Sequence, residues 1–461
     1  MRTRLSLLML LLVSITGCAS GDEGVIVYGA FDGKPQPELV VVDTSGQELH
    51  RIRLPDTVRM SFPTQLSQKA VIETFNDRWY LVDAAQGTLQ EVVFPEEARG
   101  KVFPLRLMHE ASERHWTLFG EGQGHLAYLV NLETGQVSDL TAGITEGTEF
   151  YNPNLAMFAP AEDSFVVFTS SGLWLVPTVN PGAARRLGPV TPGVAGFLDD
   201  GQQFVHCQIA PDGWTQIIVE QTDGSKSEVV ATFREMKSAR VVPGKRLILL
   251  AGQDGLSTFS VDDRTEHILW ERAALVTRVI TSDGRKALAE EADTFRWIAV
   301  DLERGVAQPL DALTGYRMVP SDVGISGRRW QYFIDSPAMG VVSLDLQTGE
   351  THEVLTLGED LKLWRPLHSS PDGRLLALAT VRAPDNNMKQ IWLLNAQTGE
   401  ARLLAEGTTV DGRFSPDGQW VAVSTFRRIG DREEASVTLM SSQGTETRPL
   451  GSGIRPVWVQ P

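Results

Sequence analysis

The sequence predicts an all-β protein built from repeated four-stranded units. Two series of turns carry this prediction, one resembling "SPDG" and the other resembling "TGE", and each turn is flanked by short apolar runs. Both series recur along almost the whole chain of 461 residues, and its last segment resembles a strand that the first repeat lacks. Together these observations predict a β-propeller of about ten four-stranded blades.

The first series is clearest in "SSPDGRLLALAT" and "FSPDGQWVAVST". Pro fixes φ near −65°, Asp bonds to nearby backbone N–H groups and Gly tolerates positive φ, so an apolar run after this turn indicates strand, tight turn and strand. The selected turn residues are Pro371, Asp372, Gly373, Pro416, Asp417, Gly418 and, in a fainter copy, Gly284. Earlier members in the same phase centre on Gly327, Gly244, Gly201, Asp163, Glu113, Gln68 and Gly24.

The second series is clearest in "LLNAQTGEARLL", "SLDLQTGETHEVL" and "LVNLETGQVSDL", whose turns fall at Gly399, Gly349 and Gly135. In phase with these turns lie Gly46, Gly87, Gly182, Gly224, Arg264, Gly305 and Gly444. Both series therefore contain ten members, and each repeat holds four strands. One four-stranded sheet leaves both faces open, so neighbouring repeats are expected to pack face to face around an axis.

The two ends of the chain predict a closed ring. The first repeat begins with residues 25–28 and lacks the strand that should precede its first turn, whereas the C-terminal "IRPVWVQP" resembles that missing strand. A C-terminal strand in the first blade would remove open sheet edges. Ten blades exceed the usual four to eight, so two stacked propellers remain an alternative at this point.

The N-terminus begins "MRTRLSLLMLLLVSITGCAS", with two Arg residues, a short apolar stretch and small residues before a Cys. The apolar stretch is too short to span a membrane and is typical of a secretory signal peptide. The segment Ile15-Thr16-Gly17-Cys18 resembles the lipobox of bacterial lipoproteins. The resemblance implies a signal peptide over 1–17, cleavage before Cys18, acyl chains such as palmitate on Cys18, and a short tether over 18–23. Ala19, by resemblance to Gram-negative lipoproteins, favours the outer membrane.

The "SPDG" turns and the strand "WLLNAQTGE" resemble the WD40-like repeats of TolB-type propellers. The repeat rhythm extends over residues 24–461, and the strongest motifs lie between about residues 359 and 453. TolB itself carries a further domain before its propeller that this sequence does not show. The resemblance therefore implies the fold and does not imply a role in the Tol–Pal system.

Charge and motifs exclude several classes of function. The formal net charge is −16, from 42 basic and 58 acidic residues, and such an acidic surface disfavours nucleic acid as a partner. The sequence has two Cys residues, which excludes a disulfide framework, and Cys207 is expected to be an inert core thiol. It lacks a G-x-S-x-G elbow and an HExxH motif, and "HEASERH" (109–115) has the wrong spacing for a zinc helix. We therefore predict no catalytic residue, metal ligand or cofactor.

The strand directions divide the connections between two faces. Both series of tight turns share one face, and we expect longer connections on the opposite face, over 120–126, 382–390 and 427–436. The candidate interaction residues there are Asn386, Asn387, Arg428 and Asp431. Long polar loops on a rigid scaffold are where binding usually resides. Because the short tether enters the first strand from the tight-turn face, that face is expected to lie near the membrane.

Two functions remain open from the sequence. The favoured one is a lipid-anchored module in the bacterial cell envelope, on the periplasmic side of the outer membrane, that binds envelope proteins or forms a subunit of an envelope complex. The alternative is a periplasmic enzyme or small-ligand binder that uses the central channel of the propeller. Converging His, Asp and Glu side chains at the channel mouth would favour the alternative.

Overall fold

The structure is a computed structural model of the chain. It describes residues 24–31, 36–63, 68–98, 102–104, 115–120, 127–140, 143–144, 157–169, 172–189, 194–198, 201–234, 236–271, 275–291, 294–319, 329–335, 340–358, 361–382, 388–429 and 432–460. Within these residues, no helix is long and apolar enough to cross a membrane.

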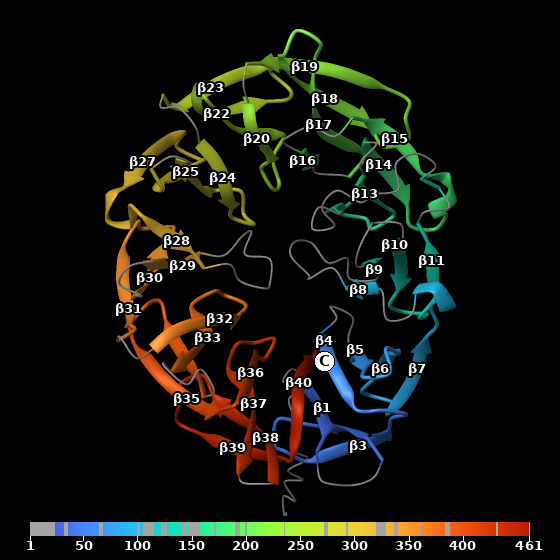
Figure 1. Cartoon of the computed structure of the whole chain (residues 1–461). Coiled ribbons are helices and arrows are strands. Elements are labelled where there is room, and N and C mark those ends of the chain that lie inside the picture. The colour runs from blue at the N-terminus through green and yellow to red at the C-terminus, as the bar shows by residue number, and fades with distance from the viewer. Residues whose placement is uncertain are drawn as a thin grey trace, which may run out of the picture.

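The described residues form ten four-stranded antiparallel sheets, each a blade with its strands in consecutive order from the inside of the ring to the outside (Figure 1). Blade 1 contains β40 (Gly453–Val459), β1 (Val25–Ala30), β2 (Glu38–Val42) and β3 (Glu48–Arg53). Blade 2 contains β4 (Val58–Pro63), β5 (Lys69–Thr74), β6 (Trp79–Asp83) and β7 (Thr88–Val92). Blade 3 contains β8 (Val102–Pro104), β9 (His115–Gly120), β10 (Ala127–Asn131) and β11 (Val137–Asp139). Blade 4 contains β12 (Met157–Phe158), β13 (Ser164–Thr169), β14 (Gly172–Pro177) and β15 (Arg185–Gly188). Blade 5 contains β16 (Val194–Phe197), β17 (Gln203–Ile209), β18 (Thr215–Gln221) and β19 (Ser227–Phe233).

The second half of the ring repeats this arrangement. Blade 6 contains β20 (Met236–Val241), β21 (Leu247–Gly252), β22 (Gly255–Ser260) and β23 (Thr265–Trp270). Blade 7 contains β24 (Leu275–Ile280), β25 (Lys286–Glu291), β26 (Arg296–Asp301) and β27 (Val306–Leu310). Blade 8 contains β28 (Tyr316–Met318), β29 (Trp330–Asp335), β30 (Gly340–Asp345) and β31 (Thr351–Thr356). Blade 9 contains β32 (Leu361–Ser369), β33 (Leu375–Arg382), β34 (Lys389–Asn395) and β35 (Ala401–Gly407). Blade 10 contains β36 (Thr409–Phe414), β37 (Trp420–Ile429), β38 (Arg432–Ser441) and β39 (Thr447–Gly451). In the described part of the chain, three single-turn 3-10 helices lie between strands: η1 (Glu96–Ala98), η3 (Pro181–Ala183) and η4 (Asp311–Leu313).

The hydrophobic core is divided among the interfaces between blades. The buried residues described form ten clusters, and each cluster joins two neighbouring blades. This division follows from the sequence, because the second and third strands of a blade are nearly continuous apolar runs that need cover on both faces. In β33, for example, the seven residues before Arg382 are all buried. The outermost strands instead alternate, as β39 does, because one of their sides meets solvent.

The C-terminal strand closes the ring, as the sequence predicts. β40 pairs with β1 in antiparallel register, with Ile26 opposite Trp458 and Val27 opposite Val457. Val457 packs in the cluster between blades 1 and 2, whereas Trp458 packs in the cluster between blades 10 and 1. Blade 10 therefore contacts blade 1 directly, and the described chain forms one ring (Figure 1). The alternative of two stacked propellers is wrong.

Both series of tight turns lie where the repeat places them. The first series connects the first and second strands of a blade, and its described Gly residues from Gly201 onward have φ between 63° and 73°. The second series connects the third and fourth strands, where Arg264 replaces Gly yet still has a φ of 55°. One member differs from the expectation: Gly182 lies in η3 rather than in a tight turn. Two members of the first series, Glu113 and Gly327, lie outside the described residues.

The opposite face, here called the loop face, differs in part from the prediction. Segment 427–436 is not a long loop, because its residues on both sides of positions 430 and 431 belong to β37 and β38. The pairing continues to the end of this hairpin, with Arg427 opposite Glu434 and Arg428 opposite Glu433. Opposite charges in directly facing positions favour such an extension. The hairpin between β21 and β22 is equally short, with Gly252 opposite Gly255.

Candidate functional site

The sequence-predicted site residues fall into three groups. Cys18, Asn386, Asn387 and Asp431 lie outside the described residues. Arg428 lies in β37, in the extended hairpin of blade 10, and therefore not in a loop. The turn residues of blades 7, 9 and 10 lie on the tight-turn face, between the first and second strands.

The "SPDG" turns are held by a hydrogen-bond pattern that repeats between blades. Ser370 Oγ donates to Asp372 Oδ1 at 2.6 Å and accepts from the backbone N of Leu375 at 2.9 Å. The backbone N of Arg374 donates to the same carboxylate at 3.0 Å. Because the Asp side chain is occupied by its own turn, these residues shape the turn rather than offer a free ligand group. The Ser or Thr that opens the turns of blades 7, 9 and 10 (Thr281, Ser370 and Ser415) was not among the predicted site residues.

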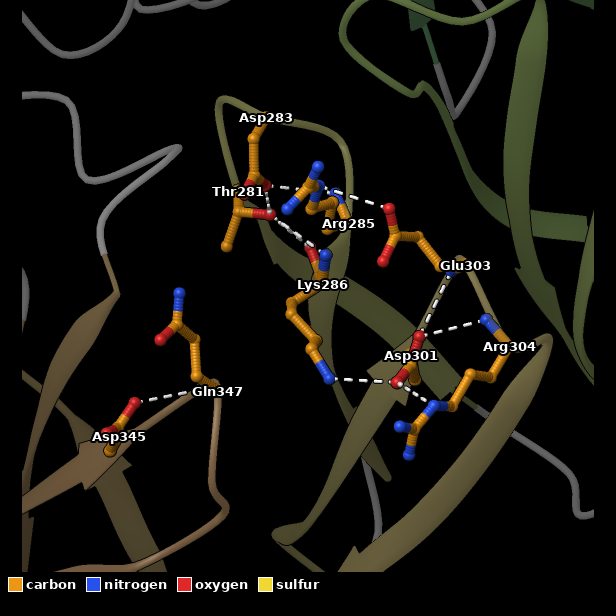
Figure 2. A network of polar contacts seen from close by, with 9 residues as sticks. All are labelled: Thr281, Asp283, Arg285, Lys286, Asp301, Glu303, Arg304, Asp345 and Gln347. Atoms are coloured by element: carbon orange, nitrogen blue, oxygen red, sulfur yellow. Dashed lines mark hydrogen bonds and ion pairs between the residues drawn. The ribbon is translucent and has the colours of Figure 1, made fainter.

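Blade 7 joins its two tight turns through a network of ion pairs (Figure 2). Asp301 accepts hydrogen bonds from the backbone N of Arg304 at 2.9 Å and from Lys286 Nζ at 2.9 Å. Arg285 Nε lies 3.1 Å from a carboxylate oxygen of Glu303. Burial acts to raise the pKa of Asp301, but these hydrogen bonds outweigh it and hold the pKa below its usual value. The network therefore ties the two turns of one blade together.

Two turn glycines give a matched test of the backbone. Gly284 has a φ of +63°, and a Cβ added there would lie 2.3 Å from the carbonyl O of Pro243 in blade 6. Gly244 has a φ of +65°, and a Cβ there would meet no atom within 4 Å. We expect Gly244→Ala to lower the free energy of unfolding by about 1–2 kcal/mol, the cost of a left-handed Ala. Gly284→Ala should cost about 1–3 kcal/mol more, because the clash is with backbone. Urea unfolding of both variants measures the difference, and equal losses would contradict the contact.

An ion pair in blade 8 between the buried Asp345 and the half-exposed Arg329 predicts a pH dependence of stability. Asp345 is 2% exposed, and Arg329 donates to its two oxygens at 2.9 and 2.5 Å. Burial acts to raise the pKa of Asp345, yet the hydrogen bonds from Arg329 and from the backbone of Gln347 lower it overall. A carboxyl whose pKa is lower in the folded state stabilises the protein above its unfolded pKa of about 3.9, and this contribution is lost as pH falls through the folded pKa.

We therefore expect Asp345→Asn to lower the free energy of unfolding at pH 7 by about 1.5–3 kcal/mol, the usual worth of charged hydrogen bonds. The loss relative to wild type should shrink between pH 5 and pH 3. Urea unfolding at these pH values measures it, and Asp254→Asn, at an exposed position of a hairpin, is the control. A loss that is the same at every pH would contradict this assignment.

The loop face carries exposed apolar side chains in the corresponding hairpins of four blades. These residues lie in the hairpins between the second and third strands, and their exposed fractions are 63% for Phe75, 42% for Trp214, 42% for Phe295 and 39% for Met388. On the described part of the tight-turn face, the comparably exposed large apolar residues are aliphatic: Val179, and Leu49 and Val306 near the start of outer strands that follow tight turns. We call Phe75, Trp214, Phe295 and Met388 the loop-face apolar set. Its members are exposed although the strands on either side of each hairpin are buried.

The buried titratable groups serve the interfaces between blades. His206 Nε2 lies 3.3 Å from Glu220 Oε2, and their side chains are 1% and 8% exposed. Arg185, from blade 4, pairs with the other carboxylate oxygen of Glu220. Burial acts to raise the pKa of Glu220, but its contacts with His206 and Arg185 lower it overall. Cys207 is fully buried, and burial raises its pKa to about 12, so it is an inert core thiol as expected.

Within the described residues, no group of three or more His, Cys, Asp or Glu side chains is arranged to hold a metal ion. Most of the buried Trp side chains pack between blades, as Trp297 and Trp458 do. The described residues thus offer two features for binding: the loop-face apolar set, and the charged inner strands of the ring.

Comparison with known proteins agrees with the fold. The sequence matches no protein-family model and no curated relative. Among solved structures, a eukaryotic initiation factor is similar over 95% of this chain and 98% of that chain, with a TM-score of 0.52 and 11% identity. This similarity extends to the overall fold alone. The chain is a β-propeller.

Two enzymes are also similar to this propeller, at lower scores. The dihydro-heme d1 dehydrogenase NirN covers 88% of this chain and 76% of its own length, with a TM-score of 0.44 and 13% identity. An oligogalacturonate lyase from Vibrio parahaemolyticus covers 82% and 95%, with a TM-score of 0.40 and 13% identity. Neither similarity assigns an activity to this propeller.

Proposed function

We propose that this propeller is a lipid-anchored protein of the bacterial cell envelope that binds another envelope protein through its loop face. The observation that carries the proposal is the loop-face apolar set, whose aromatic and Met side chains have no comparably exposed aromatic or Met counterpart on the described part of the tight-turn face. Exposed apolar groups on one face of a soluble domain mark interaction sites, and aromatic residues and Met are enriched at protein interfaces.

The scaffold supports this use of the loop face. Each hairpin that carries a member of the set connects two strands buried on both faces, so the scaffold holds its position firmly. The set is spread over blades 2, 5, 7 and 9, which present it around the ring rather than at one edge (Figure 1). Rigid presentation lowers the entropy that a partner must overcome on binding. A large partner that covers several blades fits this distribution best.

The lipid anchor is the second part of the proposal. The sequence ending in Gly17-Cys18 supports acylation at Cys18, and the described chain begins at Gly24 on the tight-turn face. The chain end is on that face too, since the backbone N of Gln68, in the turn before β5, donates to the carbonyl O of Gln460 at 2.6 Å. A tether of five or six residues reaches at most about 20 Å. The lipid would thus hold the tight-turn face toward the outer membrane and the loop face toward the periplasm.

Photo-crosslinking in intact cells tests the binding face. A photoreactive amino acid is placed at Phe75, Trp214 or Phe295, and at Val179 as the control on the opposite face. We expect the same discrete protein adduct from at least two of the three loop-face positions and none from Val179. Adducts from Val179 alone, or no adduct from a folded and lipidated protein, would refute binding through the loop face.

Labelling with a palmitate analogue tests the anchor separately. Wild-type protein should incorporate the label and sediment with membranes, whereas Cys18→Ala should do neither. Cys207→Ala is the matched control and should behave as wild type, because that thiol is buried in the core. Equal labelling of the Cys18→Ala variant and of wild type would show that the lipid is not on this residue.

A further inference from the structure

The inner strands of the ring carry a charge opposite to that of the whole chain. In the described strands β4, β8, β12, β16, β20, β24, β28, β32, β36 and β40 there are nine basic residues and one acidic residue, Asp411. The whole chain has 42 basic and 58 acidic residues. The basic residues are Arg59, Lys237, Arg240, Arg278, Arg317, Lys362, Arg365, Arg413 and Arg455. If charged residues were distributed at random along the chain, acidic residues would outnumber basic residues in these strands.

Four of these residues lie near the same end of their inner strands. Arg59, Lys237, Arg317 and Lys362 are each the second residue of an inner strand, which is its end at the loop face. We call these four residues the basic inner rim. They belong to blades 2, 6, 8 and 9, which lie on more than one side of the ring (Figure 1). These four basic residues lie near the loop-face ends of their strands, so positive charge is concentrated at the loop face.

β-bulges in the inner strands help to present these side chains. The register with the second strand shifts between Val58 and Met60, and again between Met236 and Ser238. Arg59 and Lys237 are the extra residues at these two bulges. In a regular strand each side chain would point toward one neighbouring blade, where a cation would be buried, but a bulge re-aims the side chain. Lys237 is exposed, and the Arg59 side chain keeps 38% of its surface exposed.

Three members of the basic inner rim have charge available for a ligand. Arg59 is already paired, with Asp77 at 2.8 Å and with Glu73 at 3.4 Å. Lys237, Arg317 and Lys362 are exposed, and no ion pair to them is found within the described residues. Such cations, gathered at one end of the inner strands, would attract an anion to this place, although the net charge of the whole chain is −16.

Aromatic side chains lie beside the basic inner rim. The Arg317 guanidinium lies 5.8 Å from the centre of the Phe295 ring, and Phe295 belongs to the loop-face apolar set. Trp364, in β32 two residues after Lys362, is 39% exposed, and Lys389 Nζ lies 4.6 Å from the centre of its ring. Cations and aromatic rings on one surface match the composition of protein-binding sites, where Arg and aromatic residues dominate the energy.

We infer that the basic inner rim binds an acidic segment of the partner protein, one with several Asp or Glu side chains. This inference rests on the proposed function and names the chemistry of the partner. Cations in separate blades need a ligand with several carboxylates along one chain, and the neighbouring aromatic groups match protein side chains. A long nucleic acid would carry phosphates beyond the rim, against an acidic surface.

Binding of a labelled ten-residue polyglutamate to the full-length protein tests the inference by fluorescence anisotropy. The test variant is Lys237→Gln/Arg317→Gln/Lys362→Gln. The control variant is Arg285→Gln/Arg304→Gln/Arg374→Gln, which removes the same charge from exposed residues of the tight-turn face. We expect the test variant to weaken binding about tenfold and the control to change it less than about twofold. Added salt should weaken binding to wild type.

Equal losses in both triple variants, or no loss in either, would overturn the inference. Tighter binding of a ten-nucleotide single strand than of polyglutamate would overturn it in favour of nucleic acid. The melting temperatures of both variants should stay near that of wild type, because the substituted side chains are exposed. Loop-face adducts in cells without polyglutamate binding would overturn this inference alone. Polyglutamate binding without any loop-face adduct would instead overturn the proposed function.

Discussion

Deletion of β40 is expected to open the ring and to abolish cooperative folding. The strand places Val457, Trp458 and Val459, which are 0–4% exposed, in two inter-blade clusters. Fully burying one such side chain stabilises a protein by about 1.5–3 kcal/mol, so the three together approach the whole stability of a typical domain, about 5–15 kcal/mol. The Trp458 indole N–H would also no longer donate to the carbonyl O of Arg413, a 2.9 Å bond to blade 10.

The deletion also exposes a sheet edge. Without β40, the backbone groups of β1 that face it lose their partners, and an unpaired edge of apolar strand promotes aggregation. A chain that ends at residue 452 should therefore elute as aggregates in size-exclusion chromatography and show no sharp thermal transition. The control ends at residue 459 and keeps the strand, so it should melt close to wild type. A cooperative transition at the wild-type temperature in the shorter chain would contradict ring closure by β40.

Trp297→Ala is expected to be among the most destabilising single substitutions. Trp297 is 1% exposed at the interface between blades 7 and 8, and its ring lies 4.9 Å from that of Phe333 in an edge-to-face arrangement. Its indole N–H donates to the carbonyl O of Tyr316 at 2.8 Å. Removing a buried Trp leaves a cavity and typically costs about 3–5 kcal/mol. The loss of the hydrogen bond to the Tyr316 carbonyl adds to this cost.

The same substitution at Trp214 provides the control. Trp214 is 42% exposed on the loop face, so Trp214→Ala should change the free energy of unfolding by no more than about 0.5 kcal/mol. Trp297→Phe should fall between the two, since it keeps a ring against Phe333 and loses the hydrogen bond. Urea unfolding followed by circular dichroism measures all three variants. Similar midpoints for Trp297→Ala and Trp214→Ala would show that inter-blade packing at this position contributes little.

Local chemistry explains why the architecture could be predicted from sequence. A Pro-Asp-Gly turn forms through bonds between residues two to five apart, as in the turn at Asp372, so it leaves a local signature. Ten turns in the same phase, two of them with the full Ser-Pro-Asp-Gly motif, indicated the repeat, and the strand missing from the first repeat indicated the closure. The prediction of a long loop failed where a polar segment forms strands. In segment 427–436 polar residues extend a hairpin, because facing residues of opposite charge can pair across its strands.

The candidate site was harder to predict, although signals for it exist in the sequence. The loop-face apolar set was missed because Phe75 and Phe295 look like core residues, and only their place in a hairpin exposes them. The basic inner rim leaves the short patterns "VRM", "MKS", "YRM" and "LKL" at the start of inner strands. A comparison of the starts of the inner strands would have revealed that a basic residue is the second residue in four of them. The prediction that disfavoured nucleic acid used net charge, which averages over the ring and hides a local excess of the opposite sign.

The sequence by itself determined the turns and the four strands of each repeat, because these depend on contacts between neighbours in the chain. It also indicated the strand that closes the first blade, because the other repeats show which strand the first one lacks. Only the tertiary structure decided that the ten blades form one ring, since that depends on whether blade 10 packs against blade 1. It also decided which apolar and basic side chains remain exposed. Whether a side chain is exposed depends on whether a neighbouring blade, about 40–45 residues away in the sequence, packs over it. A local sequence pattern does not show this packing.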